Sequence, residues 1–379
     1  MDALSDPRRF PDPDAAPSFA AALHSLAAKS LGAPTGREAE ASDATIRGQL
    51  EDLVARGDGE ALAGVLASAP TVAVYRHLWR SVSRLAGTGR DAGGGLAVTL
   101  FAIPIVVVVA STDSEPGVQL PGVVPDVSAL VDALREHGAL AANRAFGLAN
   151  ALVSASAIDI ARLPALLASC LLADGHVPLA LAPAPIDVTA GERAHLRFLV
   201  GSAVAAPGAD LLRDASVGAW GMPLARSLIT QLSVRGATVV ALPRAPMSLP
   251  AAIAQGRAAQ RDVSAQLFTS NALRALRASA GEPAAVISAH IAADAPGGGE
   301  LRVSLSSPFD PRDAQGLRCP LHPGERVADV ATMLVDLLHD CRVTDIRVLP
   351  GVHADRDPVT GGPLLFKPAT IPPSADSRH

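Results

Sequence analysis

The chain has 379 residues, of which 49% are hydrophobic and 18% are charged, and its net charge at pH 7 is −5. This apolar content excludes a wholly disordered chain, and the length suggests about two or three domains. The arginines are scattered, so the basic stripe typical of nucleic-acid-binding proteins is missing, and nucleic acid is not expected as a partner. Three cysteines are too few for a disulfide framework, and we expect a reducing, cytoplasmic location.

The N-terminal part predicts a loose tail followed by helices. Residues 1–16 are polar and proline-rich and lack the basic start and apolar run of a secretion signal. In residues 17–92, three stretches place apolar side chains on one helix face, with Asp43 as a candidate N-cap of the second. We therefore expect a small helical region that ends in the glycine-rich stretch 87–95.

Residues 93–112 are uncharged and long enough to span a bilayer. Their content favours a buried strand instead, because Pro104 interrupts the stretch and β-branched residues follow it. A membrane-anchored assembly factor that uses this segment remains an alternative. The whole region 93–176 is expected to hold this strand plus helices, the first of them capped by Asp126 and closed by Gly138.

After this region the pattern changes to two similar series of strand and helix signals. Residues 177–247, and residues 248–352 after a linking helix, each contain a hairpin, an amphipathic helix and a short strand that ends in Leu-Pro. Leu196 in the first hairpin matches Leu301 in the second, and the later elements follow at nearly the same spacing. We therefore predict an internal duplication of a ββαβ unit, followed by a loop and a disordered tail in residues 353–379.

The predicted fold class is α+β with α/β-type alternation, in which an N-terminal helical region precedes the duplicated ββαβ units. The same elements also fit tandem ferredoxin-like βαββαβ domains, the first starting from strand 96–110 and the second from strand 237–242. This architecture hosts many unrelated functions and identifies none. An RNA-binding version would need aromatic side chains on its central strands, where only Phe198 occurs and Val303 is its match, so RNA binding is not expected.

Few residues suggest a metal or a cofactor. No nucleophile elbow, zincin, P-loop or paired-cysteine motif is present in the sequence, and no cofactor is predicted. Cys319 and His322, together with His339 and Cys341, are of the types that bind zinc. However, His339 and Cys341 lie two residues apart in a predicted helix and point to different sides, with Cys341 in register with the core. A metal site is therefore not favoured here.

A second cluster follows the last predicted strand. In an extended chain, His353, Asp355 and Asp357 would lie on one side. There they would hold a divalent cation or act as acid and base. The alternative is a solvated polar loop in which Arg356 neutralises its neighbours.

Two long loops, 205–221 and 308–326, occupy equivalent positions in the two predicted copies and are rich in Pro, Gly and Asp. Long loops on a rigid scaffold often form binding surfaces. Trp220 and Phe309 are the aromatic side chains expected to anchor a partner there, although Trp220 would equally well cap the helix that begins nearby.

These observations favour a non-catalytic binding or assembly protein that uses the duplicated platform and its two loops as a contact surface. The expected partner is another protein or a second copy of the chain, and a membrane is not expected as a partner. The alternative is an enzyme or metal-binding protein with a site between the two copies, drawing on His353, Asp355 and Asp357, or on Cys319 and His322.

Overall fold

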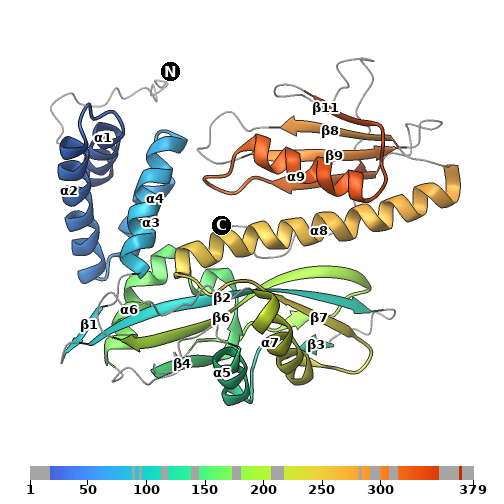
Figure 1. The fold of residues 1–379 in the computed structure, drawn as a ribbon, viewed down its shortest axis with the longest axis horizontal. Coiled ribbons are helices and arrows are strands. Elements are labelled where there is room, and N and C mark those ends of the chain that lie inside the picture. The colour runs from blue at the N-terminus through green and yellow to red at the C-terminus, as the bar shows by residue number, and fades with distance from the viewer. Residues whose placement is uncertain are drawn as a thin grey trace, which may run out of the picture.

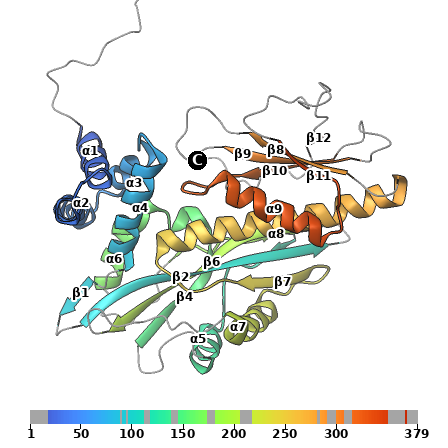
Figure 2. The ribbon, with the colours of Figure 1, turned by 45° about the horizontal axis from the view of Figure 1, so that its top comes forward.

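The chain folds into an N-terminal group of helices and two β-sheets, with one long helix between the sheets (Figure 1, Figure 2). The computed structural model describes residues 18–87, 90–93, 96–111, 118–137, 145–172, 181–205, 217–280, 284–290, 299–306, 315–349 and 367–368. This mixture of helices and mainly antiparallel strands confirms the α+β class predicted from the sequence.

The first four helices pack together at one end of the molecule (Figure 1). They are α1 (Phe19–Leu31), α2 (Gly36–Ala55), α3 (Gly59–Ala67) and α4 (Val72–Gly87). Ser18, Thr35 and Asp58 cap the first three, because each side-chain oxygen accepts the N–H of the residue three positions later. Asp43, the expected N-cap, lies inside α2 instead, because Thr35 starts that helix about two turns earlier. Apolar side chains at helical spacing fill the space between the helices: Leu23, Ile46, Leu50, Leu62 and Leu78.

The first sheet is antiparallel throughout. Its strands are β1 (Arg90–Gly93), β2 (Leu96–Ser111), β4 (Ala145–Val153), β6 (Gly191–Ala205) and β7 (Thr238–Pro243). They lie in the order β1-β2-β6-β4, and β7 pairs with the second half of β2. The long pairing of β2 with β6, from Ala97 opposite Ala205 to Ser111 opposite Gly191, forms the centre of this sheet.

The uncharged stretch 93–112 is therefore mostly strand β2, as predicted. Its side chains are buried on both faces: Ile105 and Val107 on one, Leu100 and Val106 on the other. Burial on both faces explains why the strand carries no charge. Among the described residues, no helix is long and apolar enough to cross a membrane.

Two helices, α5 (Val127–Glu136) and α7 (Val217–Leu232), cover the lower face of the first sheet in Figure 1. Asp126 caps α5, as predicted, by accepting the N–H of Ala129 at 3.0 Å. The connection between β4 and β6 contains η1 (Ala155–Ala157), η2 (Ile160–Arg162) and α6 (Leu163–Leu172).

The first of the two predicted hairpins does not form. Within residues 181–188, its first half contains the short strand β5 (Ile186–Asp187), which pairs with β3 (Gln119–Leu120) and not with β6. Strand β6 is flanked by β2 and β4 instead. Alternation of apolar residues predicts where a strand occurs, but it does not identify the neighbouring strand.

Helix α8 (Leu249–Ala280) joins the two sheets and runs between them (Figure 1, Figure 2). Its first half packs Ala252 and Ile253 against the first sheet. Its second half packs Ala265, Phe268 and Leu273 under the second sheet. One helix thus contributes to the cores of both sheets.

The second sheet has the strand order β11-β8-β9-β10-β12. Its strands are β8 (Ala284–His290), β9 (Glu300–Ser306), β10 (Gln315–Pro320), β11 (Ile346–Leu349) and β12 (Lys367–Pro368), and α9 (Val327–Asp340) packs on the same face as α8. Strands β8 and β9 form the second predicted hairpin, so that prediction is confirmed. Leu301, Val303 and Leu305 alternate along β9 and fill the core beneath it.

The strand pairings of the two predicted copies are not equivalent. β7 joins the first sheet antiparallel to β2, whereas β11 lies parallel to β8. The difference arises from β10, an additional strand within residues 308–326, which had been predicted as a loop. The strand 237–242 was expected to end the first copy and, in the alternative grouping, to begin a second ferredoxin-like domain. It belongs to the first sheet as β7.

Candidate functional site

The structure places the zinc candidates in different surroundings. Cys319 lies on β10, and its side chain is buried in the core of the second sheet. Burial raises the pKa of this thiol to about 12, which disfavours the thiolate that binds metal. Cys341 follows α9 as its C-cap and is half-buried against the same core, while His339 is exposed. In the described ranges, no group of three or more His, Cys, Asp or Glu side chains is arranged to hold a metal ion.

Of the other predicted site residues, only Trp220 lies in the described part of the chain. His353, Asp355, Asp357 and Phe309 lie outside it. Trp220 is not an exposed loop anchor: it sits in the first turn of α7, is 1% exposed and packs into the core under the first sheet. Burying the apolar surface of the indole in the core is more favourable than leaving it in water. The side chain is therefore buried, although the sequence placed it in a loop.

Ser30, Asp43 and His77 meet between α1, α2 and α4. Asp43 Oδ1 accepts hydrogen bonds from Ser30 Oγ at 2.6 Å and from His77 Nε2 at 2.9 Å. Burial opposes ionisation of Asp43, but these two hydrogen bonds, together with the charges of His77 and Arg84, outweigh it and hold its pKa below the ordinary value. The hydroxyl is bonded to the carboxylate rather than to the imidazole, so these groups link three helices and do not form a nucleophile–base pair.

An extensive polar network surrounds the turn His322-Pro323-Gly324-Glu325, which connects β10 to α9. Glu325 N–H donates to His322 O at 3.0 Å, and Gly324 has φ +88°. Proline at the second position and a left-handed glycine at the third are the residues that a type II turn requires. The Glu325 carboxylate also accepts the N–H of His322 at 2.8 Å, so the side chain closes the turn that it ends.

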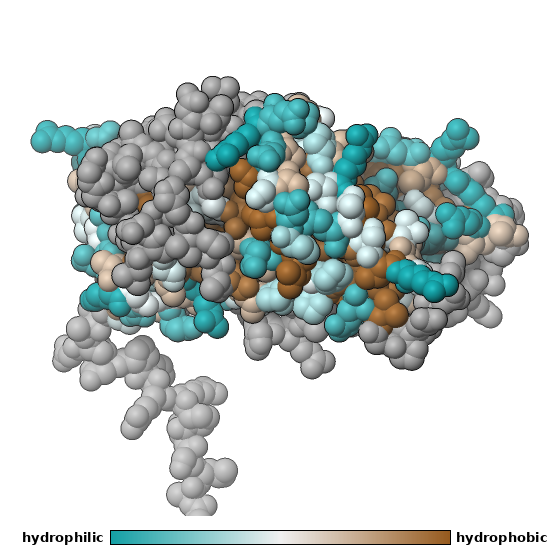
Figure 3. All heavy atoms as spheres, turned by 90° about the horizontal axis from the view of Figure 1, so that it is seen from below, coloured by the Kyte–Doolittle hydropathy of each residue, from teal (hydrophilic) through white to brown (hydrophobic). Residues whose placement is uncertain are grey.

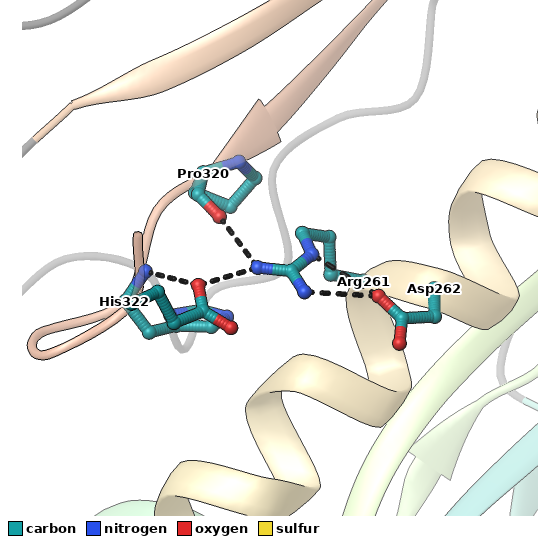
Figure 4. A network of polar contacts seen from close by, with 5 residues as sticks. Arg261, Asp262, Pro320 and His322 are labelled. Carbon is teal, nitrogen blue, oxygen red and sulfur yellow. Dashed lines mark hydrogen bonds and ion pairs between the residues drawn. The ribbon is translucent and has the colours of Figure 1, made fainter. Parts of the chain in front are cut away.

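Arg261 on α8 binds this turn. Its guanidinium donates to the Glu325 carboxylate, to Pro320 O at 3.4 Å and to Asp262 Oδ1 at 3.0 Å. Figure 4 shows the guanidinium between Asp262 on its own helix and the chain that leaves β10. Arg261 is 8% exposed, and a buried charge is tolerated only when it is paired and hydrogen-bonded. Arg261 therefore fixes the second sheet to α8.

Helix α4 holds the other side of the same turn. Arg76 Nε donates to Gly324 O at 2.9 Å, and a Cβ at Gly324 would lie 3.8 Å from the ring of Tyr75. Tyr75 stacks on Trp79 with ring centroids 6.0 Å apart. Burial raises the pKa of Tyr75 to about 12, although the nearby cation of Arg257 on α8 acts in the opposite direction. The N-terminal helices, α8 and the second sheet thus meet at this turn, which we call the junction.

The junction favours the neutral form of His322. Burial is the main cause that lowers the pKa of its imidazole, and the cations of Arg261 and Arg257 act in the same direction against Glu325. Arg261 and Glu325 are already engaged with each other. The arrangement is therefore suited to holding three parts of the molecule in register. The sequence singled out His322 only as a candidate zinc ligand in a metal site that was not favoured. It did not reveal Arg261 or Glu325, although the Pro-Gly pair was a recognisable turn signal.

A second feature is the outer edge of β7, with which no described strand pairs. Two other edges in the described part are protected: β11 carries Arg347, and residues 122–124 bond to β4. Strand β7 has no charged residue, and Val240 on it is 43% exposed. Natural sheets usually protect a free edge with charge, proline or a covering segment; of the first two, β7 has only Pro243 at its C-terminal end.

Comparisons of the chain with protein-family models, with curated proteins and with solved structures gave no match.

Proposed function

We propose that the protein is a non-catalytic binding or assembly protein and that it takes up an extended segment of a partner protein along β7. The observation that carries the proposal is the uncharged outer edge of this strand. A row of backbone N–H and C=O groups is best satisfied by another backbone, which is how strand addition binds extended peptides.

The side chains of β7 suit this role. Val239 and Ala241 are buried towards α7 and hold the strand in place. Val240 and Leu242 face the other side, where Val108 on β2 is also only half-buried. A partner segment with apolar residues at alternate positions would bury this strip, because alternate side chains of an added strand lie on the same face.

The junction supports a binding role in a second way. Arg261 and Arg76 fix the second sheet and the N-terminal helices around α8. A platform whose parts keep a fixed geometry loses less conformational entropy when a partner binds. The partner would therefore meet a preorganised surface.

We also propose a finer description of the first sheet. β2, α5, β4, β6, α7 and β7 follow one another as βαββαβ, with α6 inserted between β4 and β6. This order supports a ferredoxin-like unit around the first sheet. For the second sheet, the parallel pairing of β11 with β8 favours a different arrangement.

The test is a pull-down from the native organism with tagged full-length protein, its Val240→Lys variant and its Val348→Lys variant. Val348 is 52% exposed on β11 and provides the matched control. We expect Val240→Lys to lose a stoichiometric partner that Val348→Lys retains, because the charge blocks strand addition only at β7. Mixing the purified partner with the wild-type protein should slow amide hydrogen exchange in residues 238–242.

Equal retention of every partner by both variants, or unchanged exchange in β7, would contradict the proposal. Light scattering of the purified protein shows whether the added strand comes from a second copy. Metal is assayed in the same samples, because a metal-bearing chain without partners would support the enzyme or metal-binding alternative at His353, Asp355 and Asp357. A cytoplasmic location is part of the proposal, and the two described thiols, Cys319 and Cys341, are free, in keeping with it.

A further inference from the structure

The backbone of β7 shows which kind of segment its outer edge can take up. Arg244 N–H donates to Pro104 O at 2.8 Å and continues the register of the β2–β7 pairing. In an antiparallel pair, every second residue turns both its N–H and its C=O towards the same neighbouring strand. Counting back from Arg244 in steps of two, the residues bonded to β2 are Leu242, Val240 and Thr238. Val239 and Ala241 therefore point their N–H and C=O groups outwards.

This outward row is short, because both of its ends are closed. Pro243 has no N–H to donate, and the N–H of Ala237 already donates to Val234 O at 3.5 Å. The residues that offer both a donor and an acceptor to a new strand are thus Val239 and Ala241. No described strand pairs with them on this side.

A second copy of β7 matches this row. If two copies pair antiparallel across a two-fold axis with Val239 opposite Ala241, each outward N–H meets an outward C=O of the other copy. A register with Ala241 opposite itself would place Pro243 opposite Val239 and leave the C=O of Val239 without a donor. A register with Val239 opposite itself would place Ala241 opposite Ala237, whose N–H is already engaged. The backbone therefore selects one symmetric register.

In this register, Val240 lies on the two-fold axis and faces Val240 of the second copy. The two form a non-hydrogen-bonded pair, in which opposite side chains approach most closely. Val240 is 43% exposed in the single chain and lies opposite Val108 of β2, which is half-buried. Pairing covers this apolar strip, and it brings no like charges together, because residues 238–243 are uncharged.

The underside of the first sheet is a weaker candidate for contact with a second copy. Figure 3 views this side of the molecule, where α5 and α7 lie, and shows apolar surface interrupted by hydrophilic side chains. Contiguous apolar patches are the surfaces that mark interaction sites. At the edge of β7, in contrast, backbone complementarity adds to the apolar contact of Val240.

We infer that the partner of β7 is a second copy of the same chain. The two β7 strands pair antiparallel about Val240, and the two first sheets become one continuous sheet. This inference rests on the proposed function, because it names the partner of the edge proposed there.

The test is sedimentation equilibrium of the purified full-length protein over a series of concentrations. A small interface predicts a reversible dimer whose population rises with concentration. Val240→Lys and Val240→Asp should each be monomeric, because like charges would face each other across the axis. An equimolar mixture of the two variants should dimerise again, since Lys then lies opposite Asp. The control is Val348→Lys, at the 52% exposed Val348 of β11, which should dimerise as the wild type does.

The register is tested by disulfide formation in Val240→Cys. Opposite residues of a non-hydrogen-bonded pair have Cα atoms about 4.5 Å apart, within the range of about 4.4–6.8 Å that a disulfide needs. Mild oxidation should therefore link two copies of Val240→Cys. Thr238→Cys should give much less linked dimer, because residue 238 faces Leu242 of the other copy. The wild type, oxidised in parallel, accounts for the cysteines already in the chain.

Thermal unfolding midpoints show that each variant is folded before association is compared. A wild type that stays monomeric at every concentration overturns the inference, as does a dimer that Val240→Lys leaves intact. A mixture of the Lys and Asp variants that stays monomeric also overturns it. If the purified wild type is monomeric but Val240→Lys loses a different protein in the pull-down, the inference fails and the proposed function stands.

Discussion

Replacing Arg261 by methionine tests whether the junction is held by its buried ion pair. Methionine keeps most of the length of the arginine stem and removes the charge. The change deletes the hydrogen bonds to Glu325, Pro320 O and Asp262 and leaves the Glu325 carboxylate, which is 22% exposed, without its cation.

Removing one partner of a buried pair costs about 3–5 kcal/mol. Glu325 is partly exposed and keeps the N–H of His322 as a donor, so we expect the lower end, about 3 kcal/mol. The matched control is the double variant Arg261→Met/Glu325→Gln, in which residue 325 no longer carries an unpaired charge. A neutral glutamine still accepts the His322 N–H, so the two changes should together cost about 2 kcal/mol less than their sum, within the usual coupling range for contacting residues.

Hydrogen exchange provides the measurement, read at the amides of Glu325 and Val330, which are bonded to His322 O and Arg326 O. Their opening free energies should fall in Arg261→Met and recover in part in the double variant. The amides of α1 and α2 serve as internal controls. A loss below about 1 kcal/mol in the single variant, or strict additivity of the two changes, would show that the pair does not hold the junction.

Two further predictions concern pH and packing. The pKa of His322 is lower in the folded protein than in the unfolded chain, where it is about 6.5. Just below that pH, the unfolded chain therefore binds more protons than the folded protein. The contribution of His322 to stability should therefore be complete above about pH 6.5 and be lost as the pH is lowered. Urea midpoints measured between pH 5 and 8 should fall less in His322→Gln than in the wild type. Identical pH profiles of the two proteins would contradict this prediction. Gly201→Ala should lower stability by about 1–3 kcal/mol, because its Cβ would lie 2.4 Å from Phe101 Cζ and 2.7 Å from Leu148 Cδ2. Gly64→Ala, with nothing within 4 Å of the new Cβ, is the control, and equal urea midpoints for the two variants would refute the packing argument.

The sequence determined most of the local structure. Asp126 after a proline marked the start of α5, because a side-chain oxygen at that position satisfies an N–H of the first turn. The uncharged, β-branched stretch 93–112 marked a buried strand, because both faces of β2 are covered. These signals depend on residues close together in the chain.

The partner of each strand was decided only by the tertiary structure. Nothing in the alternation of residues 237–242 distinguishes an edge strand beside β2 from the first strand of a new domain. The strand pairing of residues 315–320 could not be predicted either. Their Pro- and Gly-rich neighbours indicated a loop, whereas in the structure these residues pair with the edge of β9 and form β10.

At the candidate site, too, the sequence predicted local structure but not the contacts between distant side chains. The Pro-Gly pair at 323–324 marked a turn, but the sequence could not connect it with Arg261, which lies 64 residues from Glu325, or with Arg76, 248 residues from Gly324. Trp220 was expected either to anchor a partner from a loop or to cap the helix that begins nearby, and it is buried because α7 extends to include it. Local sequence fixes backbone conformation through steric and hydrogen-bond preferences of neighbouring residues, whereas burial and charge pairing are settled only when distant segments come together.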